Sequence, residues 1–256
     1  MTHPYLQFAP HPRVLAHRGL VTPDEASAGV AENTLSAVAA AEAAGARYVE
    51  LDCHLTADGE VVIFHDQKLT RVTGDDRRVR DVTRAELSAI MADRGGLISL
   101  EELLEAFPEL RFNVDVKVAE AAEPAGRIIA PHADRVLLTS FDDAARLRAL
   151  AACRSAGGSP ATSPGRSIMI QLVLALALRQ GSRARRILAP LDALQIPVRM
   201  SGVAVFTPRL LRAAHDADVE VHIWTINDVT EMRRLIDAGA DGIVTDRADL
   251  ALRALG

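Results

Sequence analysis

Short runs of β-branched and aliphatic residues alternate with longer runs rich in alanine and leucine over almost the whole chain. The short runs fit buried strands and the longer runs fit helices, a pattern typical of a parallel sheet covered by helices. About eight such units in 256 residues predict an α/β fold of the (β/α)8 barrel type. The expected strands are Arg13–Ala16, Tyr48–Leu55, Val61–Phe64, Arg111–Val118, Arg135–Thr139, Ile168–Val173, Ala193–Pro197, Val219–Thr225 and Gly242–Val244.

Helix start and stop signals agree with this division of the chain. Residues that cap helix N-termini stand at Thr34, Ser99 and Asn227-Asp228, and glycines follow two of the predicted helices at Gly45 and Gly239. The expected helices are Thr34–Ala44, Leu100–Phe107, Asp142–Ala151, Pro208–Asp216 and Val229–Ala238.

Two segments interrupt the alternation. Asp58-Gly59 predicts a tight hairpin, so the second unit carries an extra strand, and a polar insertion of about residues 66–98 follows it. The segment Ser155–Ser167 is rich in serine, glycine and proline and is predicted to be a flexible loop. Nothing marks a domain boundary, so we expect residues 1–256 to form a single barrel domain with a small insertion after the second strand.

Composition excludes several classes of protein. The formal net charge of −5 and the pI of about 5.9 argue against nucleic acid or an anionic membrane surface as the main partner. The longest aliphatic run, Leu172–Leu178, is too short to span a bilayer, and no signal peptide is visible at the N-terminus. The two cysteines, Cys53 and Cys153, make no disulfide framework, so we expect a cytoplasmic protein.

Carboxylates gather on one face of two predicted strands. Because residues two apart in a strand share a face, Glu50, Asp52 and His54 point together, and so do Asn113, Asp115 and Lys117. Three carboxylates (Glu50, Asp52 and Asp115) facing one interior would repel one another, and a divalent cation relieves that repulsion. All-oxygen ligands predict one Mg²⁺ or Ca²⁺ ion. The alternative is a buried salt network in which these carboxylates pair with Lys117, Arg18 and Arg47.

Two histidines stand where a barrel enzyme carries its reactive groups. His17 ends the first strand and His65 ends the second arm of the hairpin, and catalytic side chains cluster at the carboxyl ends of barrel strands. Imidazoles titrate near neutral pH, so the two predict a general acid and base pair. Arg18 and Lys117 supply positive charge for a phosphoryl group. His54 shares the acidic face, where it either joins the site or orients a carboxylate.

Other candidate residues are less specific. Trp224, the only tryptophan, ends a late strand and is a candidate for the substrate pocket or for a core position. Phe141 has the same two alternatives. The arginines between Arg179 and Arg186 are expected to form a solvated helix or loop face, with a docking patch for anionic lipid as the alternative.

These motifs, taken in order, resemble the glycerophosphodiester phosphodiesterase family. The resemblance spans nearly the whole chain except about residues 150–205. It rests on His17-Arg18-Gly19, Glu32-Asn33-Thr34, Glu50-Leu51-Asp52, Thr56-Ala57-Asp58-Gly59, the run from His65-Asp66 to Val72-Thr73, Asp115-Val116-Lys117, Trp224-Thr225-Ile226-Asn227 and Gly242-Ile243-Val244-Thr245-Asp246.

The resemblance implies a TIM barrel that hydrolyses small-molecule glycerophosphodiesters to glycerol 3-phosphate and an alcohol. It also implies the site assignments: metal ligation by Glu50, Asp52 and Asp115, acid and base catalysis by His17 and His65, and phosphate contacts from Arg18 and Lys117, with Trp224 at the substrate. Many members of the family carry glutamate where this chain has Asp115, and the shorter aspartate can still ligate a metal. The implied mechanism uses the glycerol 2-hydroxyl as nucleophile and passes through a cyclic phosphate.

Two alternatives remain at this point. One is a phospholipase D-like enzyme on the same scaffold that cleaves lysophospholipids or sphingolipids. The other is a non-catalytic barrel that binds phosphodiesters. The sequence predicts neither the oligomeric state nor the alcohol that is released.

Overall fold

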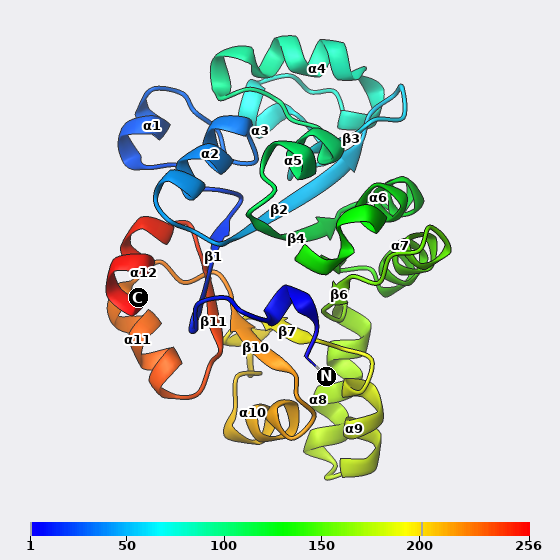
Figure 1. Ribbon diagram of the computed structural model, residues 1–256, viewed down its shortest axis with the longest axis vertical. Helices are drawn as coiled ribbons and strands as arrows, with labels where there is room; N and C mark the ends of the chain where they lie inside the picture. Colours follow the sequence, from blue (N-terminus) through cyan, green and yellow to red (C-terminus); the bar gives the residue numbers. More distant parts are fainter. Residues whose placement is uncertain (1, 201) are drawn as a thin grey trace.

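Eight parallel strands form the central sheet in the part of the chain that the computed structural model describes, residues 2–200 and 202–256 (Figure 1). Around the barrel the order is β1-β2-β4-β5-β6-β7-β10-β11, so neighbours in the chain are neighbours in space. The strands are β1 (Arg13–His17), β2 (Tyr48–Leu55), β4 (Arg111–Val116), β5 (Val136–Thr139), β6 (Ala161–Thr162), β7 (Ala193–Ile196), β10 (Glu220–Ile223) and β11 (Gly242–Thr245). The predicted (β/α)8 barrel is confirmed.

The barrel closes between β6 and β7 through a few contacts. The backbone N–H of Asp192 donates to the carbonyl of Thr162 at 3.0 Å, and the N–H of Thr162 donates to the Asp192 carboxylate at 2.9 Å. The carboxylate therefore replaces part of the strand ladder at this seam.

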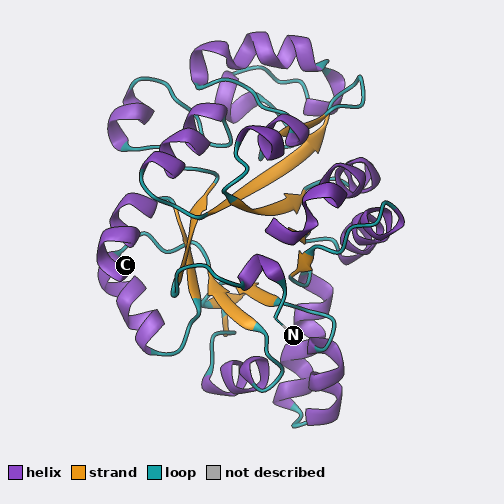
Figure 2. Ribbon diagram, viewed as in Figure 1, coloured by secondary structure: helices purple, strands orange, loops and turns teal. Residues whose placement is uncertain are grey.

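Helices surround the strands, as Figure 2 shows in purple around orange. The α-helices are α1 (Pro23–Ser27), α2 (Leu35–Ala43), α3 (Thr70–Thr73), α4 (Arg84–Met91), α5 (Leu100–Ala106), α6 (Ala122–Ile129), α7 (Asp143–Ser155), α8 (Arg166–Ala177), α9 (Gly181–Leu188), α10 (Pro208–His215), α11 (Val229–Asp237) and α12 (Ala248–Leu255). Short 3₁₀ turns are η1 (Pro4–Leu6), η2 (Val79–Asp81), η3 (Ala92–Arg94), η4 (Ala119–Ala121) and η5 (Ala130–Arg135).

The hairpin and the insertion predicted after the second strand are both present. β3 (Val61–Ile63) pairs antiparallel with the end of β2, across the turn at Asp58-Gly59. Residues 66–98 then form α3, η2, α4 and η3, which pack over a separate small core that includes Phe64, Leu69 and Leu87. A second hairpin, β8 (Arg199–Met200) with β9 (Val203–Ala204), stands apart from the barrel sheet.

One strand was predicted at the wrong place. Ile168–Val173 lies within helix α8, and the fifth barrel strand is β6, inside the segment predicted to be a flexible loop. Short apolar runs do not distinguish a strand from a buried helix, and the run continues through Leu174 to Ala177 as a helix of 12 residues. β6 has only two residues between prolines and glycines, yet Ala161 and Thr162 are buried.

Inside the barrel an apolar floor underlies a polar layer. Leu15, Tyr48, Leu137, Ala161 and Ala193 belong to one buried interior cluster. Two residues further along the same strands stand, in the same order, His17, Glu50, Thr139, Ser163 and Gln195. Because residues two apart share a face, these polar side chains point into the carboxyl-terminal half of the same interior.

The opposite end of the barrel is sealed by the N-terminal segment. Arg13, only 6% exposed, donates to the carbonyls of Leu6, Ala9 and Pro10 and pairs with Glu220 at 2.9 Å. Arg13 and His222 hold the pKa of Glu220 down to about 2, although burial opposes this. The pair fixes η1 over the floor and leaves the other end of the barrel for the site.

Two further expectations concern the surface. The arginines from Arg179 to Arg186 are exposed at the end of α8 and on α9, as expected of a solvated face. Within residues 2–200 and 202–256, no helix combines the length and the apolar character needed to cross a membrane.

The close packing of α6 on α7 yields a stability prediction. A Cβ on Gly126 would lie 2.2 Å from the carbonyl oxygen of Ala149, which is backbone and cannot move aside. We expect Gly126→Ala to lower the free energy of unfolding by about 1–3 kcal/mol, measured by urea denaturation. Gly181→Ala is the matched control, because a Cβ there meets nothing within 4 Å. Equal midpoints for the two variants would show that the helices separate without penalty.

Candidate active site

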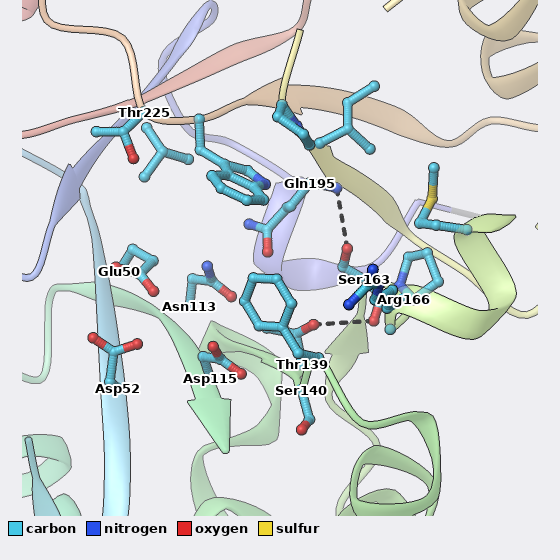
Figure 3. Close-up of a pocket in the computed structure, with 18 of the residues that line it drawn as sticks. Glu50, Asp52, Asn113, Asp115, Thr139, Ser140, Ser163, Arg166, Gln195 and Thr225 are labelled. Carbon is cyan, nitrogen blue, oxygen red and sulfur yellow. Dashed lines mark hydrogen bonds between the residues drawn. The ribbon is translucent and has the colours of Figure 1, made fainter. Parts of the chain in front are cut away.

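A cavity of about 460 Å³ opens at the carboxyl-terminal end of the barrel (Figure 3). Its lining comes from every barrel strand or the loop that follows it, and includes His17, Glu50, Asp52, His65, Asp115 and Lys117. The predicted site residues Arg18 and Trp224 also line it. The structure therefore brings all eight predicted site residues together in one cavity.

The backbone around His17 explains why Arg18 and Gly19 follow it. Both residues have positive φ, 58° and 85°, so the chain turns sharply at the end of β1. A Cβ on Gly19 would lie 2.7 Å from the backbone of Ala37 in α2, so only glycine fits. The turn directs His17 and Arg18 into the cavity, and the N–H of Arg18 donates to the Glu50 carbonyl at 2.7 Å.

The segment Glu32-Asn33-Thr34 supports the site and starts a helix. Asn33 has a φ of 56° and donates from Nδ2 to the Asp52 carboxylate at 2.9 Å. Thr34 caps α2 by accepting from the N–H of Ala37. Glu32 contacts Arg18 at 2.6 Å. The three adjacent residues thus hold Arg18, hold Asp52 and cap α2, respectively.

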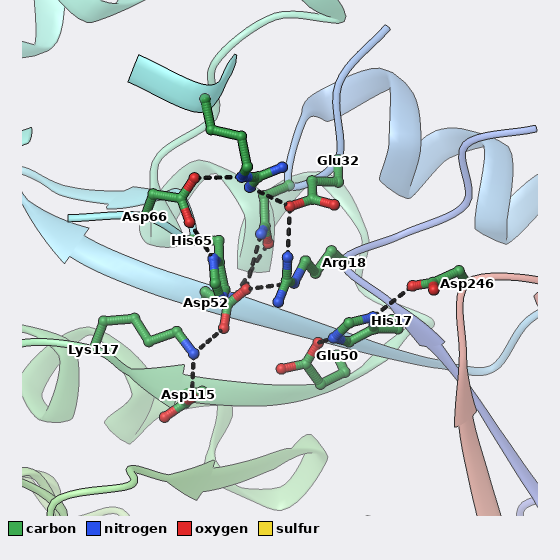
Figure 4. A network of polar contacts seen from close by, with 12 residues as sticks. His17, Arg18, Glu32, Glu50, Asp52, His65, Asp66, Asp115, Lys117 and Asp246 are labelled. Carbon is green, nitrogen blue, oxygen red and sulfur yellow. Dashed lines mark hydrogen bonds and ion pairs between the residues drawn. The ribbon is translucent and has the colours of Figure 1, made fainter. Parts of the chain in front are cut away.

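Asp52 lies at the centre of the charged groups (Figure 4). It is 1% exposed, and its carboxylate contacts Lys117 Nζ at 2.7 Å and Arg18 Nε at 3.2 Å. Burial raises the pKa of a carboxyl group, but Lys117 and Arg18 outweigh burial and lower the pKa of Asp52. Asp52 is therefore an anion at neutral pH.

Asp115 shares Lys117 with Asp52. Asp52 and Asp115 are register partners on β2 and β4, and Lys117 Nζ lies 2.7 Å from each carboxylate. Burial raises the pKa of Asp115, with Lys117 acting against it. The same two carboxylates raise the pKa of Lys117 despite its burial, so its charge is retained.

Glu50 is not paired with Lys117, which offsets the burial of Asp52 and Asp115. Its Oε2 atom is buried without a hydrogen-bond partner, and the nearest cation is His17, whose Nε2 lies 3.8 Å away. Burial, together with the nearby charge of Asp52, raises the pKa of Glu50 to about 8, with His17 opposing. Two acids two residues apart on one strand therefore have different protonation states at neutral pH.

Each of the two histidines is held by a carboxylate at Nδ1. His17 Nδ1 lies 2.6 Å from Asp246, and His65 Nδ1 lies 2.6 Å from Asp66. Burial lowers the pKa of His17, but the hydrogen bond to Asp246 and the nearby charge of Glu50 together outweigh burial, so the pKa of His17 is raised. With Nδ1 engaged, Nε2 is the atom of each ring that is free for chemistry.

A chain of ion pairs joins the insertion to the site. Arg71 of α3 contacts Asp66 at 2.5 Å and Glu32 at 2.7 Å, and Glu32 also contacts Arg18. His54, predicted to join the site or to orient a carboxylate, instead has Nε2 3.0 Å from the His65 carbonyl oxygen. These contacts fix the loop that carries His65.

The carboxylates fit a hard divalent cation by their chemistry, although they are not gathered around one. Across the part of the chain that the structure describes, no three Asp, Glu, His or Cys side chains form a ready metal site. Lys117 lies between Asp52 and Asp115 instead. Yet Glu50 Oε2 and Asp115 Oδ1 are buried oxygens without partners, and such atoms are expected where a cation binds.

The alternative salt network is present only in part. Lys117 and Arg18 do pair with the carboxylates, but Arg47 lines a different cavity beside Pro108 and Arg111. These ion pairs also leave the buried carboxyl of Glu50 without a lysine or arginine partner. A purely structural salt network would not account for a buried acid that has no ion-pair partner among Lys117, Arg18 and Arg47.

Several supporting residues escaped the sequence analysis. Asp66 and Asp246 stand in the quoted motifs, but nothing in their spacing assigned them to histidines. Asn227 also stands in a quoted motif, and its spacing gave no sign that it donates to Asp246 at 2.7 Å. Ser163 and Gln195 line the cavity as single uncharged residues, for which alternation with apolar neighbours was the one available signal. The alternation does place Asn113 on the interior face with Asp115 and Lys117, but it assigns Asn113 no role.

Comparison with known proteins gives a consistent result. The sequence model of the "Glycerophosphoryl diester phosphodiesterase family" matches residues 17–250. A protein of Mycobacterium tuberculosis named "Probable glycerophosphodiester phosphodiesterase 2" is 37% identical, over 92% of this chain and 88% of that protein. The glycerophosphodiester phosphodiesterase of Caldanaerobacter subterraneus subsp. tengcongensis is 25% identical, over 91% and 93%. The crystal structure of the Thermotoga maritima glycerophosphodiester phosphodiesterase matches with a TM-score of 0.72 and 28% identity, over 96% of this chain and 99% of that one.

The uncompensated Glu50 predicts how stability depends on pH. Its pKa is about 8 in the folded, metal-free protein and near 4.5 in the unfolded chain, so between these values the folded state binds the extra proton. Stability must then fall as pH rises through this window, by at most about 1.4 kcal/mol per pH unit.

We expect Glu50→Gln, which cannot ionise, to gain stability over the wild type as pH rises from about 5 to about 8. Urea unfolding in EDTA measures the difference. Glu60→Gln, at an exposed turn position, is the control and should run parallel to the wild type. A pH-independent difference for Glu50→Gln would mean that Glu50 is ionised throughout.

Proposed function

The chain belongs to the glycerophosphoryl diester phosphodiesterase family of hydrolases, and from this premise we propose that it hydrolyses glycerophosphodiesters to glycerol 3-phosphate and an alcohol. The observation that carries the proposal is the pair of carboxylate-held histidines, His17 and His65, in one cavity with Arg18 and Lys117. Such a cavity offers proton transfer and positive charge to the same phosphodiester.

We propose that one divalent cation, Mg²⁺ or Ca²⁺, is held by Glu50, Asp52 and Asp115. A bound cation would polarise the phosphoryl oxygens and neutralise their charge. The unpartnered oxygens of Glu50 and Asp115 support this assignment. Because the pKa of Glu50 is about 8 without a metal, cation binding near neutral pH would be accompanied by release of the Glu50 proton.

The protein's own groups account for the remaining chemistry. Arg18 and Lys117 hold the phosphate, whose negative charge persists through the reaction. One histidine takes the proton of the glycerol 2-hydroxyl as that oxygen attacks phosphorus, and the other gives a proton to the departing alcohol. A cyclic phosphate results, and water opens it with the histidines in exchanged roles. Asp246 and Asp66 stabilise whichever imidazole is protonated.

Trp224 and Phe141 together form an aromatic part of the cavity lining. Their rings meet edge to face, with centroids 5.9 Å apart, and Phe141 is 58% exposed. We propose that this aromatic lining contacts the substrate beside the phosphate. Lys117 Nζ lies 5.3 Å from the Phe141 ring centroid, so the aromatic lining adjoins the phosphate position.

The cellular setting is proposed on simpler grounds. Cys53 and Cys153 are both free and buried, and free cysteines suit a reducing cytoplasm. The single-domain organisation of residues 1–256 stays a prediction.

The acid and base roles predict large losses of turnover. We expect His17→Ala and His65→Ala each to lower kcat for glycerophosphocholine by about two or more orders of magnitude, measured as release of glycerol 3-phosphate. His215→Ala is the matched control, because His215 is a half-exposed residue on α10 that does not line the cavity. Near-normal turnover in either cavity variant would remove that histidine from the mechanism.

The proposed ligands predict a metal effect that is visible without turnover. We expect EDTA to abolish activity and Mg²⁺ or Ca²⁺ to restore it. The same ions should raise Tm, since 100-fold excess over Kd adds about 2.7 kcal/mol. Glu50→Gln and Asp115→Asn should need more metal for both effects, whereas the exposed control Glu105→Gln should not. Activity that is indifferent to EDTA would exclude the metal.

A further inference from the structure

Two side-chain amides in the polar layer of the barrel have no apparent role in the proposed chemistry. Asn113 of β4 and Gln195 of β7 both line the cavity. Asn113 Oδ1 and Gln195 Nε2 are buried and have no hydrogen-bond partner among the described residues. Buried amide atoms are nearly always paired in folded proteins, so two unpaired ones in one cavity point to a missing ligand.

The strand alternation places both amides inside the barrel. Phe112 and Val114 flank Asn113 and pack outward into the large core, and Leu194 and Ile196 do the same on either side of Gln195. The backbone N–H of Gln195 donates to Ser163 Oγ at 3.1 Å, which fixes its strand against β6. Figure 3 shows the two side chains reaching toward the same part of the cavity, with Asn113 between Glu50 and Asp115.

The unpaired atoms are complementary in kind. Asn113 Oδ1 is an acceptor, and Gln195 Nε2 is a donor. A hydroxyl group needs one of each. A quaternary ammonium group offers no hydrogen bond, and a primary ammonium group offers only donors, so neither would satisfy Gln195. Ionised phosphate oxygens only accept, so among the groups of a glycerophosphodiester an alcohol hydroxyl is the one that can serve both atoms.

We propose that Asn113 and Gln195 form a subsite for the primary hydroxyl of the substrate's glycerol moiety. The hydroxyl donates to Asn113 Oδ1 and accepts from Gln195 Nε2. The inference rests on the proposed function, in which the neighbouring 2-hydroxyl is the nucleophile. Holding the primary hydroxyl fixes the glycerol chain and so orients the 2-hydroxyl toward phosphorus. The subsite thus makes the enzyme selective for glycerol over shorter diols.

The test compares glycerophosphocholine with 2-hydroxyethyl phosphocholine, which keeps the phosphodiester, the choline and the nucleophilic hydroxyl but lacks the primary hydroxymethyl group. With saturating metal, we expect the wild type to prefer glycerophosphocholine in kcat/KM. Gln195→Met and Asn113→Leu should each reduce that preference about five- to tenfold, the effect of one lost uncharged hydrogen bond. Any loss in their kcat/KM for the two-carbon analogue should be smaller than the loss for glycerophosphocholine by that same factor.

The control is Met169→Leu, an apolar exchange in the same cavity lining, which should change both substrates by the same factor. Equal losses on both substrates in the amide variants would reveal a structural role and overturn the proposal. An increased metal requirement in Asn113→Leu would make Asn113 a cation ligand instead. If the amide variants lost more kcat/KM for glycerophosphoglycerol than for glycerophosphocholine, the amides would contact the leaving alcohol. That result would also contradict the proposal.

A binding measurement separates this inference from the proposed reaction. Calorimetry compares glycerol 3-phosphate with 2-hydroxyethyl phosphate on the wild type and on Gln195→Met. Selective binding of glycerol 3-phosphate that Gln195→Met abolishes, without turnover of any diester, would support the subsite and reject the reaction. Turnover with unchanged selectivity in both amide variants would reject the subsite alone.

Discussion

The buried carboxylate of Asp52 is the interaction on which the arrangement of the site depends. A charge that is 1% exposed needs partners, and it has Lys117, Arg18 and Asn33. These partners come from the segments after β1, before α2 and after β4, so one carboxylate fixes three loops. Removing one partner of a buried ion pair typically costs about 3–5 kcal/mol, which makes the geometry stiff. The turn that carries Arg18 also follows His17 directly, and Arg18 is linked through Glu32 and Arg71 to Asp66 beside His65.

The same arrangement leaves Glu50 unpaired. Both cations near the acidic face are engaged by Asp52 and Asp115, and only His17 approaches Glu50, at 3.8 Å. The site therefore combines an anion that stabilises the fold with an acid that is protonated at neutral pH for lack of a cation. Environments that push the pKa values of neighbouring acids apart are characteristic of functional sites.

Much of this could be predicted from the sequence, because a strand has a period of two and the proposed metal ligands and phosphate contacts are charged residues. The alternation along Tyr48–Leu55 places Glu50 and Asp52 on one face, and the barrel order follows from the βα rhythm. The failures have physical causes. β6 is too short to carry a period, and the run from Ile168 satisfies a strand and a helix equally. Asp246 reaches His17 only because β11 closes against β1, a contact that no local pattern encodes.

The polar layer explains why such a site is tolerated in a stable fold. Glu50 and Gln195 stand two positions beyond Tyr48 and Ala193 on the same strands, so their unpaired atoms lie above the hydrophobic floor. At the other end, Arg13 satisfies its donors on carbonyls of the N-terminal segment and on Glu220, which closes the barrel. The core between strands and helices and the floor are thus both apolar, and the unpaired polar groups of the cavity lie outside them. Because the strands run parallel, the unpaired atoms of Glu50, Asn113, Asp115 and Gln195 all lie at the carboxyl-terminal end of the barrel and line a single cavity.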